Sequence, residues 1–324
     1  MNIGILGATG LVGQTFLDLL KDSSLKITNL HLFASEKSQG QTIKFKSKDY
    51  TVEVISEDHL KNLDLLFIAT GNDLSLHWSP IAVKHGCFVV DNSSAFRMHP
   101  ESALVVPEVN PELINSKKPQ IIANPNCSTI QLTLPLKALS NDYTIKSVKV
   151  ASYQSVSGAG KEAQMELIEQ SKNPDKTFTP VNFTHPIAFN SIPQIGSFLD
   201  DGFSTEEDKI MMETRKILNL PDLNISAFTV RVPSLNGHAE VLWIELDQQI
   251  TKSQFIQSLK KMPNLVVSED GFHVVRDVSG QKEVFVGRIH MDRFDTKTWI
   301  IWVVADNLLK GAAWNALQIA ELLF

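Results

Sequence analysis

Cys127 stands in the polar stretch Asn124-Pro125-Asn126-Cys127-Ser128-Thr129, directly after an apolar run typical of a strand and before a run typical of a helix. Unpaired amides and the macrodipole at a helix start favour a thiolate. The sequence therefore predicts a nucleophilic cysteine at position 127. Pro135, inside the expected helix, predicts a bend or an early end there. Cys87 opens the apolar run Cys87–Val90 and is expected to be buried and inert.

The first strand-like run, Ile3–Leu6, leads into Gly7-Ala8-Thr9-Gly10-Leu11-Val12-Gly13 and then into apolar residues at helical spacing. This GxxGxxG pattern is a variant of the dinucleotide fingerprint, in which glycines permit a tight turn and a close approach to a pyrophosphate at the helix N-terminus. The alternative is a glycine turn without a ligand. The residues expected to bind the dinucleotide are Gly7, Thr9, Gly10, Leu11, Val12 and Gly13.

The second strand, Leu30–Phe33, ends in small residues where an NAD enzyme would carry an acid for the ribose hydroxyls. Ala34 and Ser35 leave room for a 2′-phosphate, and Lys37 and Ser38 offer it a cation and a hydroxyl. NADP is therefore preferred over NAD. Glu36 is the competing feature, because it could itself hold the ribose.

Two further segments carry polar groups in a strand-turn context. In Arg231–Glu240, a Pro/Asn/Gly turn separates Arg231 from His238, a pairing that can offer a cation for a carboxylate and an acid/base near neutral pH. In Ser152–Lys161, a strand enters a loop of small residues and then a helix. Such a loop can pass close to a nucleotide, although it is also an ordinary helix start.

The elements that must position these residues fall into two regions. Strand-like runs alternate with helical segments through the first 125 or so residues, at 29–33, 63–69, 87–90, 103–106 and 121–123. That alternation predicts a parallel, Rossmann-type α/β sheet. From Tyr143 the chain has longer strand-like stretches, at 144–154, 223–232, 238–247, 283–291 and 297–304, and 171–184 is expected to be an exposed loop. We expect a dinucleotide-binding domain over 1–127, an α+β domain over 128–306, and a closing helix over 307–324 that packs with the first domain.

Composition narrows the class of protein. The 324 residues are 43% hydrophobic and 20% charged, as in a folded globular chain, and a net charge of −6 disfavours a nucleic-acid partner. Two cysteines forty positions apart predict neither a disulfide framework nor a metal site. The start of the chain lacks the features of a secretory signal, and no apolar stretch approaches the roughly 20 residues of a membrane span. A cytoplasmic protein is expected.

Seven blocks, taken together and in order, resemble the aspartate-β-semialdehyde dehydrogenase family, of the shorter Gram-positive-like bacterial type. The resemblance covers nearly the whole chain. The blocks are Gly7–Gly13, Asp91–Arg97, Val106–Asn110, Asn124–Thr129, Ser152–Lys161, Arg231–Glu240 and Asp306–Ala313.

The resemblance implies a Rossmann domain followed by a catalytic and dimerisation domain of the glyceraldehyde-3-phosphate-dehydrogenase-like kind. It implies NADPH-dependent reductive dephosphorylation of L-aspartyl 4-phosphate to aspartate semialdehyde and phosphate through a thioacyl intermediate on Cys127. This step leads to lysine with diaminopimelate, methionine, threonine and isoleucine. The resemblance further implies small-molecule substrates and neither a membrane nor a nucleic-acid partner. It implies a homodimer, with a tetramer as the alternative.

The resemblance also implies roles for individual residues, each at a position that matches the family pattern. His238 is the acid/base, and Gln154 positions the substrate near the nucleophile. Arg231 grips the substrate carboxylate, a task that suits a planar fork. The other implied contacts are Arg97 and Lys209 for phosphate, Glu206 for the ammonium group with Glu207 as the alternative, and Ser157, Gly158 and Asn307 for the cofactor.

The chain departs from the family pattern in two places. Lys37-Ser38 replaces the common Arg-Ser, which keeps the charge and loses the bidentate grip on a 2′-phosphate, and Leu309 replaces a common arginine. Two alternatives to the main interpretation are an N-acetyl-γ-glutamyl-phosphate reductase and a catalytically silent paralogue. Trp243, Trp299 and Trp302 are expected either on a sheet face that a partner covers or in the core.

Overall fold

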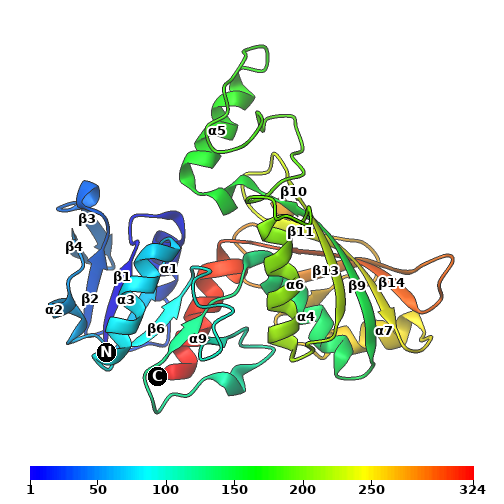
Figure 1. Ribbon diagram of the computed structural model, residues 1–324, viewed down its shortest axis with the longest axis horizontal. Coiled ribbons are helices and arrows are strands. Elements are labelled where there is room, and N and C mark those ends of the chain that lie inside the picture. Colours follow the sequence, from blue (N-terminus) through cyan, green and yellow to red (C-terminus); the bar gives the residue numbers. More distant parts are fainter. The chain divides into compact units, whose positions relative to one another are not determined.

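The computed structural model describes residues 1–324 and divides into two compact units (Figure 1). The first unit comprises Met1–Pro125 and Ala312–Phe324, and the second comprises Asn126–Gly311. Cys127 and residues 307–311 thus lie in the second unit, a few residues away from the expected boundaries. None of the helices combines the length and the apolar character needed to cross a membrane.

An eight-stranded sheet forms the first unit, in the order β3-β4-β2-β1-β5-β6-β8-β7. All neighbouring strands are parallel except β3 and β4, which form an antiparallel hairpin at one edge. The hairpin was not predicted, because its charged, largely exposed residues lack the apolar run of a central strand. The strands are β1 (Asn2–Leu6), β2 (Asn29–Phe33), β3 (Thr42–Phe45), β4 (Lys48–Glu53), β5 (Leu65–Ile68), β6 (Phe88–Asp91), β7 (Ala103–Leu104) and β8 (Ile121–Ala123).

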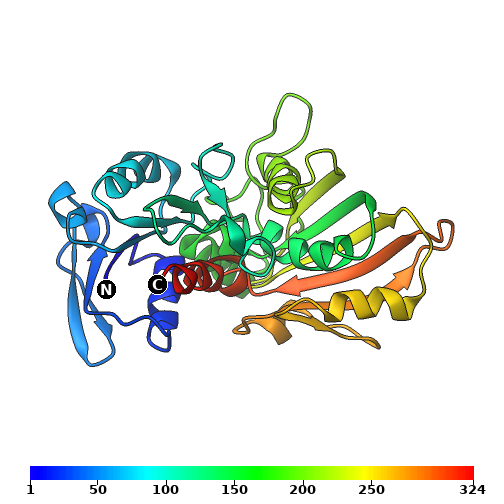
Figure 2. The same ribbon diagram turned by 90° about the horizontal axis from the view of Figure 1, so that it is seen from below.

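Helices cover both faces of this sheet. On one face α1 (Leu11–Leu20) packs beside α9 (Trp314–Leu323), and the two share one apolar core with the central strands (Figure 2). On the other face a second core includes Leu60 of α2 (Glu57–Leu60) and Ala82 of α3 (Asn72–Lys84). The Rossmann-type arrangement expected from the sequence is confirmed. Short 3₁₀ turns lie at Glu36–Ser38 and Pro111–Leu113.

The closing helix differs from the prediction at its start. Residues Leu309–Ala313 form a π-helical turn, and regular α-helix begins only at Trp314. The apolar spacing that predicted one helix from residue 307 does not distinguish a π turn from an α turn, because both keep the same residues on the buried side.

A six-stranded mixed sheet forms the second unit, in the order β10-β9-β11-β14-β13-β12. The outer pairs β10–β9 and β12–β13 are parallel, and the inner pairs are antiparallel. The five predicted strands agree with the structure to within about two residues. The strands are β9 (Ile145–Gln154), β10 (Asn224–Arg231), β11 (His238–Leu246), β12 (Leu265–Val267), β13 (Val284–Met291) and β14 (Thr298–Ala305).

Three of the longer helices cover one face of this sheet. α4 (Cys127–Ser140) contacts β9, β11 and β14, while α6 (Thr205–Leu218) contacts β10 and α7 (Lys252–Lys260) contacts β13 (Figure 1). The unit also contains α5 (Lys161–Lys172), α8 (Val275–Val278) and a 3₁₀ turn at Val156–Ala159. The residues between α5 and α6 form mostly exposed loops, as predicted for 171–184.

Three tryptophans of the second sheet, Trp243, Trp299 and Trp302, do not all lie on the same face. Trp243 and Trp302 are half-buried on the face opposite α4, here named the open face, where α8 packs against Trp302. Trp299 is buried on the other face and stacks on Phe255 of α7 at a ring distance of 4.6 Å. Of the two environments expected from the sequence, Trp299 therefore has the core one, whereas Trp243 and Trp302 lie on the other face of the sheet. The reason is the period of two along β14, which places residues 299 and 302 on opposite faces.

Candidate active site

The glycine turn of the first unit has the backbone geometry that the fingerprint requires. Gly7 has a φ of +91°, and a Cβ there would lie 2.5 Å from the Ala69 carbonyl oxygen. A Cβ on Gly13 would lie 2.2 Å from the Gly7 carbonyl oxygen, so the third glycine lets α1 pack against the turn. Gly10 caps α1 without a side-chain hydrogen bond, which leaves the amides of the first turn available to an anion.

A cavity of about 760 Å³ opens beside this turn. Of the cofactor residues predicted in the first unit, Gly7, Thr9, Gly10 and Lys37 line it, whereas Leu11, Val12, Gly13 and Ser38 do not. The remaining lining residues are Leu6, Ala34, Ser35, Glu36, Val54, Ile55, Ala69, Thr70, Leu74 and Trp78. A dinucleotide fits this site, because the glycine turn leaves space that a Cβ would occupy and the adjoining cavity is large enough and has many apolar wall residues.

Leu74 and Trp78 of α3 are wall residues that the sequence analysis missed. They are four positions apart, so they project from the same side of the helix. That spacing was readable in the sequence. Nothing in it indicated that this side faces a cavity, because helix-to-sheet packing produces the same spacing.

Cys127 is the first residue of α4, as predicted. The side chain of Asn126 caps the helix by accepting hydrogen bonds from the backbone N–H groups of Ser128 (2.9 Å) and Thr129 (3.2 Å). The Cys127 side chain is half-buried. Pro135 predicted a bend or an early end, and of these two outcomes the early end is wrong, because α4 continues to Ser140. Cys87 is fully buried, and burial raises the pKa of its thiol far above the ordinary value, as expected for an inert cysteine.

Glu206, in the first turn of α6, is the centre of a buried polar cluster. Its Oε1 accepts hydrogen bonds from Nδ2 of Asn126 (2.8 Å) and Nε2 of Gln154 (3.0 Å), and its Oε2 lies 3.5 Å from Nζ of Lys209. Burial alone would raise the pKa of Glu206, but Lys209, the two hydrogen bonds and Arg231 together hold it below the ordinary value. The cluster therefore contains a carboxylate at neutral pH.

Glu207 is engaged elsewhere. Its carboxylate accepts the backbone N–H groups of Ser204 (2.6 Å) and Thr229 (2.8 Å), the first of these bonds being half of the capping box that starts α6. The sequence left Glu206 and Glu207 as alternatives. The structure brings Glu206 to Gln154 and the helix of Cys127, and uses Glu207 to join α6 to β10.

Arg231 is the last residue of β10 and His238 is the first residue of β11, and β9 lies between these two strands in the sheet. Nη1 of Arg231 donates to the backbone carbonyl of Ser155 (2.6 Å). Burial lowers the pKa of Arg231, and the negative charges of Glu206 and Cys127 offset part of that effect, so the guanidinium stays charged. His238 pairs in register with Gln154, which places both side chains on the face of the sheet that carries α4.

The ring of His238 is fully buried, and its Nδ1 lies near two groups of Ser155, the backbone N–H (3.1 Å) and the hydroxyl oxygen (3.2 Å). Its Nδ1 accepts the backbone N–H of Ser155 at 3.1 Å, so the neutral ring carries its proton on Nε2, which has no hydrogen-bond partner. Burial, followed by the charge of Arg231, lowers the pKa of His238 to about 3. At neutral pH the ring is therefore an uncharged donor.

The absence of a side chain at Gly158 avoids crowding Arg231 and His238. A Cβ at this position would lie 3.1 Å from Nη1 of Arg231 and 3.3 Å from Nε2 of His238. A similar constraint operates beside the cysteine, where a Cβ on Gly311 would approach that of Cys127 to 2.9 Å. Glycines thus leave room around the thiol, the guanidinium and the imidazole.

Ser157 and Asn307 lie on the same side of this unit. Oδ1 of Asn307 accepts the backbone N–H of Gly237 (2.8 Å) and the hydroxyls of Ser157 (3.0 Å) and Ser155 (3.2 Å). The amide oxygen is thus fully used within the protein. Arg97 belongs to the first unit, where its Nη2 donates to the Asn92 carbonyl (3.0 Å).

Two residues of the cluster, Asn126 and Ser155, were missed by the sequence analysis. Asn126 had a readable signal, since asparagine before a helix start is a preferred N-cap. Ser155 had none, because it contributes a backbone N–H whose target is 83 residues away.

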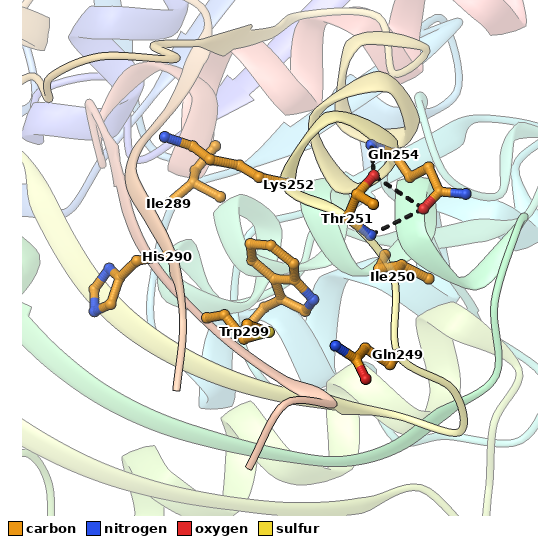
Figure 3. A pocket seen from close by; sticks show the side chains of 9 residues that line it. Gln249, Ile250, Thr251, Lys252, Gln254, Ile289, His290 and Trp299 are labelled. Atoms are coloured by element: carbon orange, nitrogen blue, oxygen red, sulfur yellow. Dashed lines mark hydrogen bonds between the residues drawn. The ribbon is translucent and has the colours of Figure 1, made fainter. Parts of the chain in front are cut away.

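The second unit also has a cavity whose walls contain none of the predicted site residues. This cavity, of about 710 Å³, lies between α7 and β14, and its walls include Ile250, Lys252, His290 and Trp299 (Figure 3). No group of three or more His, Cys, Asp or Glu side chains in the chain is arranged to hold a metal ion.

Comparison with known proteins agrees with this architecture. Residues 2–117 match the family model described as "Semialdehyde dehydrogenase, NAD binding domain", and residues 136–310 match "Semialdehyde dehydrogenase, dimerisation domain". An aspartate-semialdehyde dehydrogenase of Aquifex aeolicus is 43% identical over 99% of this chain and 97% of its own length.

Two solved structures extend the comparison. Aspartate semialdehyde dehydrogenase II of Vibrio cholerae, complexed with ASA, has 41% identity and a TM-score of 0.95 over 99% of this chain and 97% of that one. The Candida albicans enzyme with NADP has 25% identity and a TM-score of 0.78 over 99% of this chain and 98% of that one. These matches cover both units, including an NAD(P)-binding domain, and they favour the main interpretation over its alternatives. The chain belongs to the aspartate-semialdehyde dehydrogenase family.

Proposed function

We propose that the chain catalyses the NADPH-dependent reductive dephosphorylation of L-aspartyl 4-phosphate to L-aspartate 4-semialdehyde and phosphate. The step would serve the synthesis of lysine with diaminopimelate, methionine, threonine and isoleucine. The observation that carries the proposal is the buried cluster in which Glu206 bonds both Gln154 and Asn126, the cap of the Cys127 helix. The first unit would bind the cofactor, and the second would supply the catalytic and dimerisation surfaces.

The proposed chemistry uses the thiolate of Cys127 as the nucleophile. Sγ attacks the acyl carbon of the substrate, the bond from carbon to the phosphate oxygen breaks, and phosphate leaves a thioester on Cys127. The cofactor, when bound, supplies the hydride that reduces this thioester. The resulting thiohemiacetal collapses as its C–S bond breaks, which releases the aldehyde and restores the thiolate.

The charged groups of the cluster match the charges of the substrate. Arg231 would hold the α-carboxylate with its planar fork, and Glu206 would hold the ammonium group. Gln154 would position the acyl group beside Cys127. Lys209, whose side chain is 35% exposed, and Arg97 are the proposed phosphate contacts. An acylated amine carries no positive charge for the Glu206 carboxylate to bind, so the buried charge favours the free-amine substrate over the acetylated alternative.

His238 would act through Nε2. Because Nδ1 is occupied by the N–H of Ser155, Nε2–H is the group available to the substrate oxygen. It would donate to the oxyanion that forms when hydride reaches the thioester carbon, and so stabilise the thiohemiacetal before it collapses.

We propose NADP as the preferred cofactor. Ser35 and Lys37 line the cavity after β2, where a hydroxyl and a cation suit a 2′-phosphate, and a related enzyme is known with NADP. Glu36 lines the same cavity and would favour NAD if it turned toward the ribose. Ser157, Gly158 and Asn307 are the proposed cofactor contacts from the second unit, and Asn307 would use its amide nitrogen.

We also propose a homodimer formed through the open face of the second sheet. Phe228, Ala151, Val241 and Trp302 stand directly opposite one another across four strands of that face, and Phe228 is 58% exposed. An apolar row of this kind on an otherwise folded domain is typical of an interface.

The need for a reduced thiol at Cys127 fits a cytoplasmic location.

The test is the phosphate-dependent reduction of NADP by the purified protein with L-aspartate semialdehyde. Activity that requires phosphate and falls at least about 10³-fold in Cys127→Ser would support the reaction and the nucleophile together. Cys87→Ser is the matched control and should keep full activity, because Cys87 is buried in the first unit. A folded wild-type protein that binds NADP but turns over only the acetylated γ-glutamyl substrate, or neither substrate, would overturn the proposal.

A further inference from the structure

Asp306 is a buried carboxylate that the proposed chemistry does not use. It directly follows β14 and is 2% exposed. Four N–H groups donate to it. Oδ1 accepts the backbone amides of Leu308 (2.8 Å) and Leu309 (3.0 Å), and Oδ2 accepts Nδ2 of Asn236 (2.7 Å) and the backbone N–H of Gly280 (2.8 Å).

Two of these bonds organise the chain around Asp306 itself. Leu308 directly precedes the π-helical segment and Leu309 is its first residue, so Oδ1 of Asp306 reaches past Asn307 and fixes the backbone that follows it. Asn307 in turn accepts the backbone N–H of Gly237 at 2.8 Å. The two adjacent side chains, Asp306 and Asn307, therefore reach the same turn of the chain from one short segment.

That turn is Asn236-Gly237, which immediately precedes His238. Asp306 holds the side chain of Asn236, and Asn307 holds the backbone of Gly237. Gly237 has a φ of +86°, a conformation that a chain without fixed neighbours would leave readily. His238 follows at the start of β11, so the position of its ring depends on the conformation of this turn.

The carboxylate is specifically required by this pattern of bonds. Both oxygens accept two N–H groups each, and an amide in place of the carboxyl would present one NH₂ to two donors. Bonds from N–H groups to a buried carboxylate are also stronger than bonds between neutral groups. Asparagine at position 306 would keep the size of the side chain and break at least one pair of bonds.

We propose that Asp306 is a positioning residue for His238. By fixing the Asn236-Gly237 turn, it keeps Nδ1 of the imidazole against the N–H of Ser155 and Nε2–H directed at the substrate oxygen. The role assigned to Nε2–H rests on the proposed function, whereas the effect of Asp306 on the ring itself does not.

The first test is a double-mutant cycle on kcat between position 306 and position 238. Asp306→Asn should lower kcat about 10-fold or more and change the KM of aspartate semialdehyde less than about twofold. In a His238→Asn background the same substitution should change kcat less than about twofold, because the group that it positions is absent. A similar loss in both backgrounds, or no loss in either, would overturn the proposal.

Two further variants separate positioning from folding. Asn236→Ala removes one donor to Oδ2 and leaves Asp306 in place, so it should lower kcat as Asp306→Asn does. The double variant should have a kcat no lower than that of Asp306→Asn alone. Asp277→Asn is the matched control, since Asp277 is exposed and caps α8 through the backbone N–H of Val274. It should leave kcat unchanged. An additive effect of Asn236→Ala would contradict a shared action through the turn.

The second test does not depend on activity. In protein with ¹⁵N-labelled histidine, the two ring nitrogens of His238 should show the Nε2–H tautomer in the wild type, assigned against His238→Asn. Asp306→Asn should shift this signal toward a mixture of tautomers. An inactive wild type would contradict only the proposed function. An unchanged tautomer signal in Asp306→Asn would contradict only the proposal that Asp306 positions His238.

Discussion

The backbone N–H of Ser155 points at Nδ1 of His238, at a distance of 3.1 Å, and so determines which ring nitrogen carries the proton. A ring that donated from Nδ1 would meet this N–H with a proton of its own. The neutral Nε2–H tautomer is therefore favoured, and the imidazolium form is disfavoured because the ring is also buried beside Arg231. His238 is thus placed to donate a hydrogen bond while uncharged.

The first prediction concerns the pH dependence of stability. His238 has a folded pKa of about 3 against an ordinary value of 6.5, so between these values the unfolded chain binds a proton that the folded chain does not. The free energy of unfolding should therefore fall as pH decreases below 6.5, by about 2 kcal/mol at pH 4.5 from this group. His238→Asn should reduce this slope when urea unfolding is measured at several pH values. An equal slope in both proteins would contradict the buried, neutral ring.

The second prediction separates two adjacent carboxylates. Glu206→Gln removes the charge proposed for the substrate ammonium group and should raise the KM of aspartate semialdehyde by about 10-fold or more. Glu207→Gln instead disturbs bonds to the N–H groups of Ser204 and Thr229, and it should lower the free energy of unfolding by about 1–2 kcal/mol with little change in KM. Steady-state kinetics and thermal unfolding of both variants provide the check. The reverse assignment of effects would show that Glu207 binds the substrate.

The third prediction concerns the choice of cofactor. Lys37→Ala should weaken NADP binding about 10-fold and leave NAD binding nearly unchanged, because only NADP carries the 2′-phosphate that the lysine would contact. Glu36→Gln should have the smaller effect on NADP. Titration of each variant with both dinucleotides would measure these constants. Loss of NAD binding in Glu36→Gln, with no effect in Lys37→Ala, would assign the ribose contact to Glu36.

The fourth prediction concerns the open face of the second sheet. Phe228→Glu should convert the dimer to monomers in sedimentation at micromolar concentration, because a charge would be buried in the apolar row. Phe294→Glu is the control. Phe294 is 98% exposed and lies between β13 and β14, outside that row, so its replacement should leave the assembly unchanged. A wild-type monomer, or a stable Phe228→Glu dimer, would argue against this interface.

Much of the fold could be predicted because its signals are local. The apolar run Ile3–Leu6, the glycines that follow it and the helix start at Cys127 each have a signal within about ten residues of sequence. The β3–β4 hairpin was missed because an exposed edge carries no strong local pattern. The π-helical start of the last helix was missed because its apolar spacing also fits an α-helix.

The sequence by itself determined the elements and the residue types able to do chemistry, because periodicity, turn glycines and helix caps act between near neighbours. Tertiary structure alone decided which of those residues meet. The pairing of β9 with β11 sets His238 opposite Gln154, and the packing of α6 selects Glu206 rather than Glu207 for the cluster. The N–H of Ser155, 83 residues before His238, then selects the tautomer. Such contacts depend on burial and strand register, which no local pattern in the chain encodes.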